Sequence, residues 1–312
     1  MKTIEQPISK QSRETSKHYK LKKQLTPYLF LLPALIVLGV TVFYPALQAF
    51  SLSFTRYEGF TQPPQWIGWE NFQRLWTDKV FWETLKNTFL YLVGVVPILV
   101  VAPLGLAILV NRKLGGIHWF RLSFYTPVII STIVAGIAWR ALYDTNGIFN
   151  QGLKAIGFTE SIRWLTSPQL ALWSVMAVTI WKGLGYYMVI YLAGLQSIPA
   201  ELYEAASLDG SDGWKKHWYI TVPLMRPYLL LVAVISSISA MKVFEEVYIM
   251  TRGGPLNSSK TVVYYVYEQA FTASDYSYGC TIGLVLFLFI VGLSILNLNL
   301  SRHSGGERNW QL

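Results

Sequence analysis

Six long apolar stretches dominate the pattern of hydrophobic and polar positions along the chain. Each is close to the roughly 20 residues that a helix needs to cross the hydrocarbon core of a bilayer. They occupy residues 27–50, 85–110, 120–142, 170–195, 227–249 and 279–300. Prolines inside some stretches do not exclude a membrane helix, because neighbouring helices can satisfy the freed backbone groups. The pattern therefore predicts an all-α, polytopic membrane protein with six transmembrane helices.

The composition favours an integral membrane protein over a soluble one. Only 14% of the 312 residues are charged, against about 25% in a typical soluble domain. The 12 Trp and 19 Tyr residues fit the aromatic belts at membrane–water interfaces. The lone Cys280 excludes an internal disulfide, and the four His residues have no ligand spacing, so no metal site is expected. No nucleophile–base motif stands out, so no catalytic residue is expected either.

The distribution of Lys and Arg predicts the orientation of the spans. The net charge of +9 would suggest an acidic partner for a soluble protein, but cytoplasmic loops of membrane proteins accumulate these residues. With the N-terminus inside, fifteen Lys and Arg residues fall on the inner side and nine on the outer side. Both termini and the loop between the fourth and fifth spans are therefore expected in the cytoplasm, at a bacterial-type plasma membrane.

The same pattern divides the chain into one membrane domain with two tails. Residues 25–300 form the predicted membrane domain, and residues 301–312 a short cytoplasmic tail. Residues 1–24 are polar and basic, and we expect them to be disordered. The first apolar run is longer than the core of a signal peptide, so cleavage is not expected. Trp residues in the loops between the spans predict short interfacial helices there.

The loop at residues 196–222 is a charged segment between two apolar spans. Pro199 precedes a predicted short helix at 201–206, and Gly210 lets the backbone turn at no steric cost. A second short helix is predicted at 213–219, ending before Pro223. The two helices would form a compact knob. Its key positions are Glu204, Ala205, Ala206, Asp209, Gly210, Ile220 and Pro223.

The spacing of these residues resembles the coupling motif of ABC importer permeases. In that family E-A-A is followed by three residues, G, nine residues, I, any residue and L-P. The chain has Val222 in place of the Leu, which exchanges one apolar residue for another. The resemblance implies the type I importer permease fold and a knob that docks into an ATP-binding subunit. An amphipathic loop lying on the membrane is the alternative that the residues alone leave open.

Further segments resemble the carbohydrate-uptake branch of this family. Residues 193–204, AGLQSIPAELYE, are similar to its approach to the coupling motif. Residues 66–72 are similar to its first outer loop, and residues 253–261 to its last. The similarity covers roughly residues 27–300 and is greatest to permeases of the maltose-importer type.

This resemblance also implies a set of partners. They are a second homologous permease, two ATP-binding ABC subunits, an extracytoplasmic solute-binding protein, a sugar and the lipid bilayer, with no nucleic acid. The chain itself has no G-x-x-x-x-G-K-[ST] segment to cradle nucleotide phosphates. We therefore expect ATP and Mg²⁺ on a partner subunit, no cofactor on this chain, and no enzymatic activity of its own.

Polar residues inside the spans are candidates for a substrate pathway, because they are costly in lipid and usually face a cavity or a partner. In the fourth span, Lys182 lies beside Gly183, and Tyr186 offers a ring and a hydroxyl. By resemblance to the maltose-importer permease, Gly183 and Tyr186 match positions that contact substrate, and Lys182 occupies a third with a different residue type. In the fifth span Ser236 matches a polar position, and Ser239 lies about one turn further on.

The outer end of the fifth span carries Lys242, Glu245 and Glu246. Their spacing allows a structural ion pair on one helix face, or charges that snorkel to the interface. The alternative is that Glu245 or Glu246 accepts hydrogen bonds from sugar hydroxyls. The two serines have an alternative role as well, because serines in spans often bond only to their own helix backbone.

These observations predict a permease subunit that forms half of a heterodimeric pore for a sugar, an oligosaccharide or polyol. An ABC permease for another solute class is the nearest alternative. An ion-coupled secondary transporter, with Lys182 and Glu245 or Glu246 as titrating groups, is a second, but it gives the knob no role. A membrane-embedded enzyme is a third, for which no motif is found.

Overall fold

The computed structural model describes residues 27–57, 63–112, 115–211 and 213–304 of the chain. Helices make up nearly all regular structure in these residues, beside one two-stranded antiparallel hairpin. The predicted tail at 1–24 lies outside the described residues, as does most of the predicted tail at 301–312. The last helix continues to Ser304, beyond the predicted end of the sixth span at residue 300.

Four helices are long and apolar enough to cross a membrane unbroken. They are Pro27–Leu52, α4 (Lys79–Val110), α8 (Ala171–Gln196) and α15 (Tyr276–Ser304). The first contains the π-helical turn η1 (Gly39–Phe43) followed by α2 (Tyr44–Leu52). Two further helix pairs have the composition of a span but are sharply bent. If each bent pair is one crossing, the described residues contain six, which agrees with the prediction.

The predicted third span, 120–142, is two helices rather than one. α5 (Ile117–Ile129) and α6 (Thr132–Leu142) meet at an angle of 100°. Between them Ile130 and Ser131 have ψ angles of 129° and 140°, so the helical hydrogen-bond ladder cannot pass through them. The prediction of one continuous helix was wrong, because apolar composition indicates the length of a span but not its straightness.

The predicted fifth span, 227–249, is interrupted as well. α12 (Arg226–Met241) ends early, and α13 (Glu245–Met250) is a separate helix. At its other end α12 meets the helical segment Trp214–Leu224 at 68°. Residues 242–244 therefore form a link between two helices, and not the middle of one.

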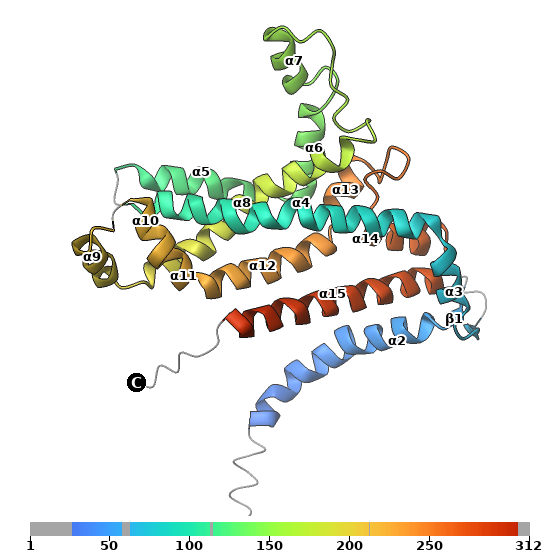
Figure 1. Cartoon of the computed structure of the whole chain (residues 1–312). Coiled ribbons are helices and arrows are strands. Elements are labelled where there is room, and N and C mark those ends of the chain that lie inside the picture. The colour runs from blue at the N-terminus through green and yellow to red at the C-terminus, as the bar shows by residue number, and fades with distance from the viewer. Residues whose placement is uncertain (1–26, 58–62, 113–114, 212, 305–312) are drawn as a thin grey trace, which may run out of the picture.

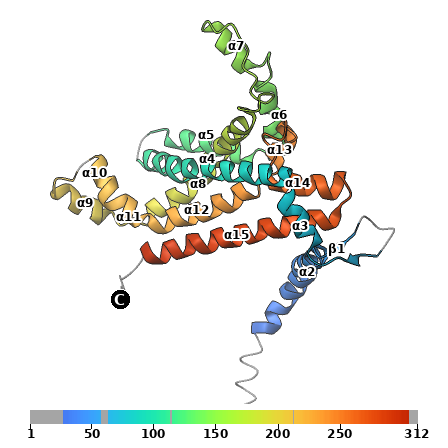
Figure 2. The ribbon, with the colours of Figure 1, turned by 45° about the vertical axis from the view of Figure 1, so that its right-hand side comes forward.

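The helices that hold the cavity described below lie side by side in one bundle. α4 packs against α8 and α12, α5 packs on α8, and α15 packs on α12 and α2 (Figures 1 and 2). α9 (Ala200–Leu208) and α10 (Trp214–Lys216) lie at one end of the bundle. The opposite end carries the hairpin of β1 (Thr55–Arg56) and β2 (Gln65–Trp66), together with α3 (Glu70–Thr77), α14 (Val262–Tyr267) and η3 (Glu268–Thr272).

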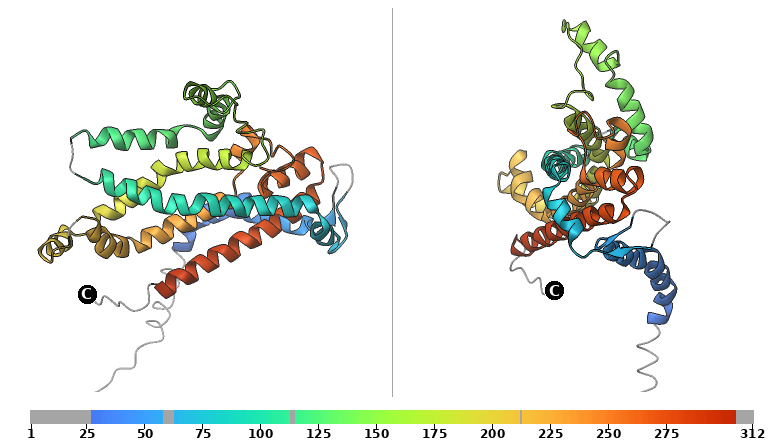
Figure 3. Two further views of the ribbon diagram at one scale, coloured as in Figure 1. Left: turned by 45° about the horizontal axis from the view of Figure 1, so that its top comes forward. Right: turned by 90° about the vertical axis from the view of Figure 1, so that its right-hand side faces the viewer.

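The third span leaves this bundle after its bend. α6 and the short helix α7 (Ile148–Ala155) stand out sideways from the other helices in each view (Figure 3). The short helices predicted between the spans are present as α3, α7 and α14. The knob and the loops predicted to lie outside are thus at opposite ends of the bundle, as the six-span topology requires.

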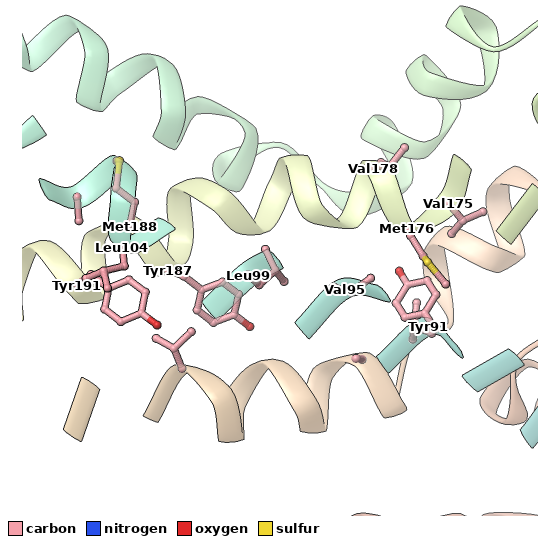
Figure 4. Close-up of a cluster of buried hydrophobic side chains, with 14 of the residues drawn as sticks. Tyr91, Val95, Leu99, Leu104, Val175, Met176, Val178, Tyr187, Met188 and Tyr191 are labelled. Carbon is pink, nitrogen blue, oxygen red and sulfur yellow. The ribbon is translucent and has the colours of Figure 1, made fainter. Parts of the chain in front are cut away.

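Buried hydrophobic side chains pack between the helices of the bundle (Figure 4), and glycines let the helices come close. Tyr91 and Val95 of α4 and Met176 and Met188 of α8 are almost completely buried. A Cβ atom at Gly185 would lie 2.0 Å from the backbone oxygen of Phe124. Only glycine therefore allows the observed contact between α8 and α5, in keeping with the small residues found at membrane helix interfaces.

Asp78 joins three helices at the end of the bundle opposite the knob. Its carboxylate accepts hydrogen bonds from the backbone N–H groups of Val80 (2.9 Å) and Phe81 (3.3 Å), which caps α4. It also accepts from the hydroxyls of Tyr265 in α14 (2.7 Å) and Tyr278 in α15 (2.5 Å). Burial opposes ionisation, but the hydrogen bonds from Tyr278 and Tyr265 outweigh it, so the pKa of Asp78 lies below its ordinary value.

We expect Asp78→Asn to lower the thermal unfolding midpoint of the detergent-solubilised protein by several degrees. The amide keeps one acceptor oxygen but loses the charge, and hydrogen bonds to a charged group are worth about 1.5–3 kcal/mol each. Because the folded pKa of Asp78 is lowered, its stabilisation is complete above the unfolded pKa of about 4. It is lost as pH falls through the folded pKa.

Glu70→Gln is the matched control for Asp78→Asn. It removes one charge from the exposed Arg56–Glu70 ion pair at the same end of the bundle, and such pairs contribute at most about 1 kcal/mol. An Asp78→Asn midpoint equal to that of Glu70→Gln would show that the carboxylate does not hold these helices together.

Candidate functional site

A cavity of about 380 Å³ lies between α4, α5, α8, α12 and α13. Its walls come chiefly from the fourth and fifth spans, the two that the sequence singled out. Six of the seven residues predicted for a substrate pathway line it: Lys182, Gly183, Tyr186, Ser236, Ser239 and Glu246. The folded chain therefore brings these residues together around one space in the middle of the bundle.

Tyr186 gives the cavity an accessible aromatic surface. Its side chain is 44% exposed, and its ring centroid lies 5.0 Å from that of Tyr187 in a T-shaped contact. Tyr187 is buried in the core of the bundle. The buried ring supports the exposed one, which limits the orientations that Tyr186 can take.

Lys182 connects the cavity to the break in the third span. Its ammonium group donates a hydrogen bond of 2.7 Å to the hydroxyl of Thr132. Thr132 is the first residue of α6, directly after the extended residues that separate it from α5. An ammonium group has three donors, so the bond to Thr132 leaves two for other acceptors in the cavity.

Glu246 brings a carboxylate to the same cavity from the start of α13. It interacts with the hydroxyl of Thr179 and with the charge of Lys182. Thr179 in turn shares a hydrogen bond with the hydroxyl of the fully buried Tyr91. The cavity thus contains one cation, held by Thr132, and one anion, which lies close to Thr179.

The two predicted serines differ in what their hydroxyls can do. Ser236 is buried, and its Oγ donates a 2.6 Å hydrogen bond to the backbone oxygen of Val232, one turn earlier on α12. This is the local bond that a serine in a span often makes, and it leaves Ser236 only acceptor capacity toward the cavity. Ser239 is exposed and lines both this cavity and the one next to it.

Glu245, the seventh predicted residue, lines an adjoining cavity of about 230 Å³ together with Lys242 and Phe244. The ion pair that helical spacing would allow, one of the alternatives for Lys242, does not form, because α12 ends at Met241 and a new helix begins at Glu245. Among the described residues Lys242 makes no ion pair with either glutamate. The interruption separates residues that a continuous helix would place on one face.

Gly183 has a packing role beside its place in the cavity wall. A Cβ atom there would lie 2.7 Å from Cδ2 of Leu99 on α4. A larger residue would therefore press on Leu99, which lines the same cavity. The glycine keeps α8 close to α4 and leaves the cavity open.

Three polar residues of the site were missed by the sequence analysis: Tyr91, Thr132 and Thr179. Thr179 could have been found, because it precedes Lys182 by three positions and so lies on the same helix face. Thr132 lies 50 residues from Lys182, and only the tertiary fold brings the two together.

The knob has the predicted first helix and turn but a longer second helix. α9 begins after Pro199, and Gly210 has a φ angle of +75°, which favours glycine. The second helix was expected to end before Pro223. Instead α10 continues through η2 (His217–Thr221) into α11 (Val222–Leu224). Pro223 lies in the first turn of α11, where proline is tolerated.

The knob exposes large apolar side chains although it folds firmly on itself. Lys216 donates a 2.5 Å hydrogen bond to Ser207, so the second helix is tied to the first. The exposed apolar side chains are Leu208, Trp214, Trp218 and Tyr219, each at least 68% exposed. Glu204, Ala205, Asp209 and Gly210 of the predicted motif are exposed as well, whereas Ala206, Ile220 and Pro223 are half-buried. In the described part of the chain this surface is uncovered.

No group of three or more His, Cys, Asp or Glu side chains in the described residues is arranged to hold a metal ion. The polar groups of the cavity can donate and accept hydrogen bonds, and Tyr186 can pack on an apolar surface. This chemistry suits the binding of a polar solute.

Comparison with known proteins gives the family. A model of the family described as binding-protein-dependent transport system inner membrane component matches residues 79–304. The lactose transport system permease protein LacF of Rhizobium radiobacter is 34% identical over 296 residues, which cover 93% of this chain and 98% of that protein. The arabinooligosaccharides transport system permease protein AraP of Halalkalibacterium halodurans is 31% identical over 305 residues, covering 96% of this chain and 95% of that protein.

A solved structure has the same fold. One chain of a bacterial ABC transporter involved in the import of the acidic polysaccharide alginate matches with a TM-score of 0.80 and 23% sequence identity, covering 92% of this chain and 99% of that chain. The chain therefore belongs to the family of binding-protein-dependent transport system inner membrane components, and it is a transport permease with the type I ABC importer fold.

Proposed function

We propose that this chain is the membrane-spanning subunit of an ATP-driven importer for a sugar, an oligosaccharide or polyol, delivered by a solute-binding protein. The observation that carries the proposal is the central cavity. It combines the exposed ring of Tyr186 with the ammonium of Lys182 and the carboxylate of Glu246. The saccharides named for the relatives LacF and AraP support the same substrate class.

The cavity suits a polyhydroxylated solute better than an apolar or a strongly charged one. The C–H face of a sugar ring can pack on an aromatic ring, while fixed polar groups hold the hydroxyls. Lys182 donates, Glu246 accepts, and Ser239 can do both. Because Lys182 and Glu246 carry opposite charges, these charges offset each other in the cavity. A neutral solute therefore needs no charged group of its own to bind there.

The chain supplies half of the pore in this proposal, and a second, homologous permease supplies the other half. Tyr186 and Ser239 are exposed although they line a cavity at the centre of the spans. The first span, Pro27–Leu52, has no buried residue in its most apolar window. A second set of helices would cover such surfaces.

Energy reaches the pore through the knob. The exposed side chains of Leu208, Trp214 and Trp218 offer an apolar surface of the kind found at protein interfaces. In our proposal two ATP-binding subunits hold ATP and Mg²⁺, and each docks one permease knob. When these subunits close on ATP, they move the knobs as rigid bodies, and the pore opens outward. ATP hydrolysis returns the subunits and the pore to the starting state.

The knob and both termini lie in the cytoplasm in this scheme. The larger number of Lys and Arg residues on that side supports the orientation. The opposite end, with α3 and α14, then faces outward, where a solute-binding protein can reach it.

Two alternatives keep the fold but change the function. An importer for another solute class would use the same knob with a differently matched cavity. An ion-coupled transporter would use Lys182 and Glu246 as titrating groups, but it would leave the exposed apolar surface of the knob without a purpose.

Gly210→Pro and Glu204→Lys should each reduce solute uptake at least about tenfold while the chain still inserts into the membrane. Proline cannot adopt the φ angle of +75° at position 210. A charge reversal at the exposed Glu204 removes a docking contact, and central interface contacts are worth about 1.4 kcal/mol or more. Uptake into vesicles and the ATPase rate of the assembled importer are the measurements.

Glu160→Lys is the control for these knob variants, since it is the same charge reversal in an exposed loop far from the knob. It should leave uptake unchanged. Normal uptake by both knob variants would refute the docking role.

Tyr186→Ala should reduce uptake about tenfold or more, because stacking of a sugar on an aromatic ring is worth about 1–2 kcal/mol. ATPase activity stimulated by the unloaded binding protein should stay close to that of the wild type. Tyr186→Phe, which keeps the ring, should retain most of the uptake. If Tyr186→Ala transports the same sugars at the wild-type rate, Tyr186 is not part of the site.

Single-cysteine labelling tests the orientation, and the lone Cys280 makes it simple. In a Cys280→Ala background, Lys154→Cys should react with a membrane-impermeant maleimide in intact cells. Leu208→Cys should react only after the cells are permeabilised. Both positions are exposed in the structure. Labelling of Leu208→Cys from outside would overturn the topology.

A further inference from the structure

A second polar pocket, of about 410 Å³, lies away from the knob and apart from the central cavity. Three segments form it: the end of α6 with the residues that follow, the loop before α8, and the turn after α13. Its polar and aromatic residues include Arg140, Tyr143, Asp144, Arg163, Trp164 and Thr251. None of them belongs to the predicted substrate pathway or to the knob.

The pocket has more positive than negative charge, and its cations are unpaired. Arg140 and Arg163 are both exposed, and within the described residues neither side chain makes an ion pair or a hydrogen bond. Asp144 lines the same pocket but forms no ion pair with either arginine, and its Oδ1 accepts the backbone N–H of Asn146 (2.9 Å) within its own turn. Two guanidinium groups are thus available to an anion from outside the chain.

Trp164 adds a third unused donor at the same place. Its Nε1–H is buried and has no hydrogen-bond partner among the described residues. The ring is held by contacts with Tyr143 (5.6 Å between centroids) and Phe149 (6.4 Å), and its backbone oxygen accepts the hydroxyl of Ser174 (2.9 Å). A buried donor left unpaired is costly, so a small shift on docking that lets an outside acceptor reach Nε1 would relieve that cost.

The pocket is also connected to the central cavity by two short helices. α6 places Thr132 at the central cavity's lysine and Arg140, in its last turn, at the pocket. α13 places Glu246 in the central cavity and Met250 in the pocket. The two helices pack closely on each other at Gly136, where a Cβ atom would lie 3.0 Å from Ile249. They are drawn beside each other in Figure 1.

We infer that this pocket receives a carboxylate side chain, Asp or Glu, of the solute-binding protein. Guanidinium groups bind carboxylates in a bidentate, charge-assisted way, and an indole N–H can donate to the same anion. The inference rests on the proposed function, which puts the pocket on the outward side where that protein docks. A docked carboxylate would displace Arg140 or the Thr251 turn, and α6 and α13 would carry the displacement to Lys182 and Glu246.

The test measures the affinity of the binding protein for the complete importer in lipid nanodiscs. The probe is the solute-binding protein that stimulates ATPase activity of the wild-type importer. Arg140→Gln with Arg163→Gln should weaken this affinity at least about tenfold and make it less dependent on salt. Trp164→Phe, which keeps the ring contacts, should weaken it two- to fivefold, on the order of one lost hydrogen bond. Basal ATPase activity without the binding protein should not change.

Lys154→Gln is the matched control, because it removes an exposed cation from α7, between the two segments that carry Arg140 and Arg163 but outside the pocket wall. It should leave the affinity as it is. Amide variants of the acidic residues on the binding protein identify the partner. One of these amide variants should bind the wild-type importer more weakly than the unmodified binding protein does. It should bind the double arginine variant as tightly as the unmodified binding protein does.

Three results would overturn the inference. One is an unchanged affinity and salt dependence of the double arginine variant. Another is a loss of uptake with unchanged affinity, which would assign the arginines to the solute or to the second permease. A third is a weakened affinity of the double arginine variant when no amide variant of the binding protein weakens binding to the wild-type importer. A wild-type importer that no binding protein stimulates would instead contradict the proposed function itself.

Discussion

In the hydrocarbon core of a bilayer, a backbone N–H or C=O group without a protein partner costs several kcal/mol, because no water is there to bond with it. α4, α8 and α15 meet this constraint by running as continuous helices. Two other spans do not, and each is interrupted where other polar groups of the protein are close. After the break in the third span, Thr132 accepts a hydrogen bond from Lys182. At the end of the fifth span, the carbonyl of Val243 accepts the hydroxyl of Thr261 at 3.0 Å.

These interruptions also add polar groups to the region of the central cavity. Each break starts a new short helix, and the start of each carries a polar residue to the cavity region: Thr132 on α6 and Glu246 on α13. Irregular backbone within a membrane protein is tolerated where it is enclosed by protein or lines a cavity. The walls of the cavity come chiefly from the unbroken α8 and from α12, and the breaks add the start of α13 and the Thr132 hydroxyl that holds Lys182.

The parts of this structure that could be predicted from sequence are the local ones. The length of an apolar run indicates a span, and the turn at Gly210 follows from residues a few positions apart. The first break was missed because the sequence on both sides of Ile130 and Ser131 is mostly apolar, and the second because Lys242, Glu245 and Glu246 also fit one face of a continuing helix. Contacts between residues far apart in the sequence could not be predicted either. Asp78 accepts hydrogen bonds from Tyr265 and Tyr278, which are 187 and 200 positions away in the sequence. The ion pair that helical spacing allows for Lys242 fails at the second break, since that spacing means nothing once the helix has ended.

The central cavity is bounded by elements that reach both ends of the bundle. α12 extends toward the knob, and α6 and α13 extend to the outer pocket. A ligand or partner changes a distant site only if it binds the two states of a connecting element with different affinity. α6 and α13 are in close contact at Gly136, so a displacement of one helix would press on the other. One break separates α6 from α5, and another separates α13 from α12. These breaks would allow such a displacement without unwinding a span. A continuous third or fifth helix would lack this freedom, so the inferred response of the cavity to a docked binding protein depends on these interruptions.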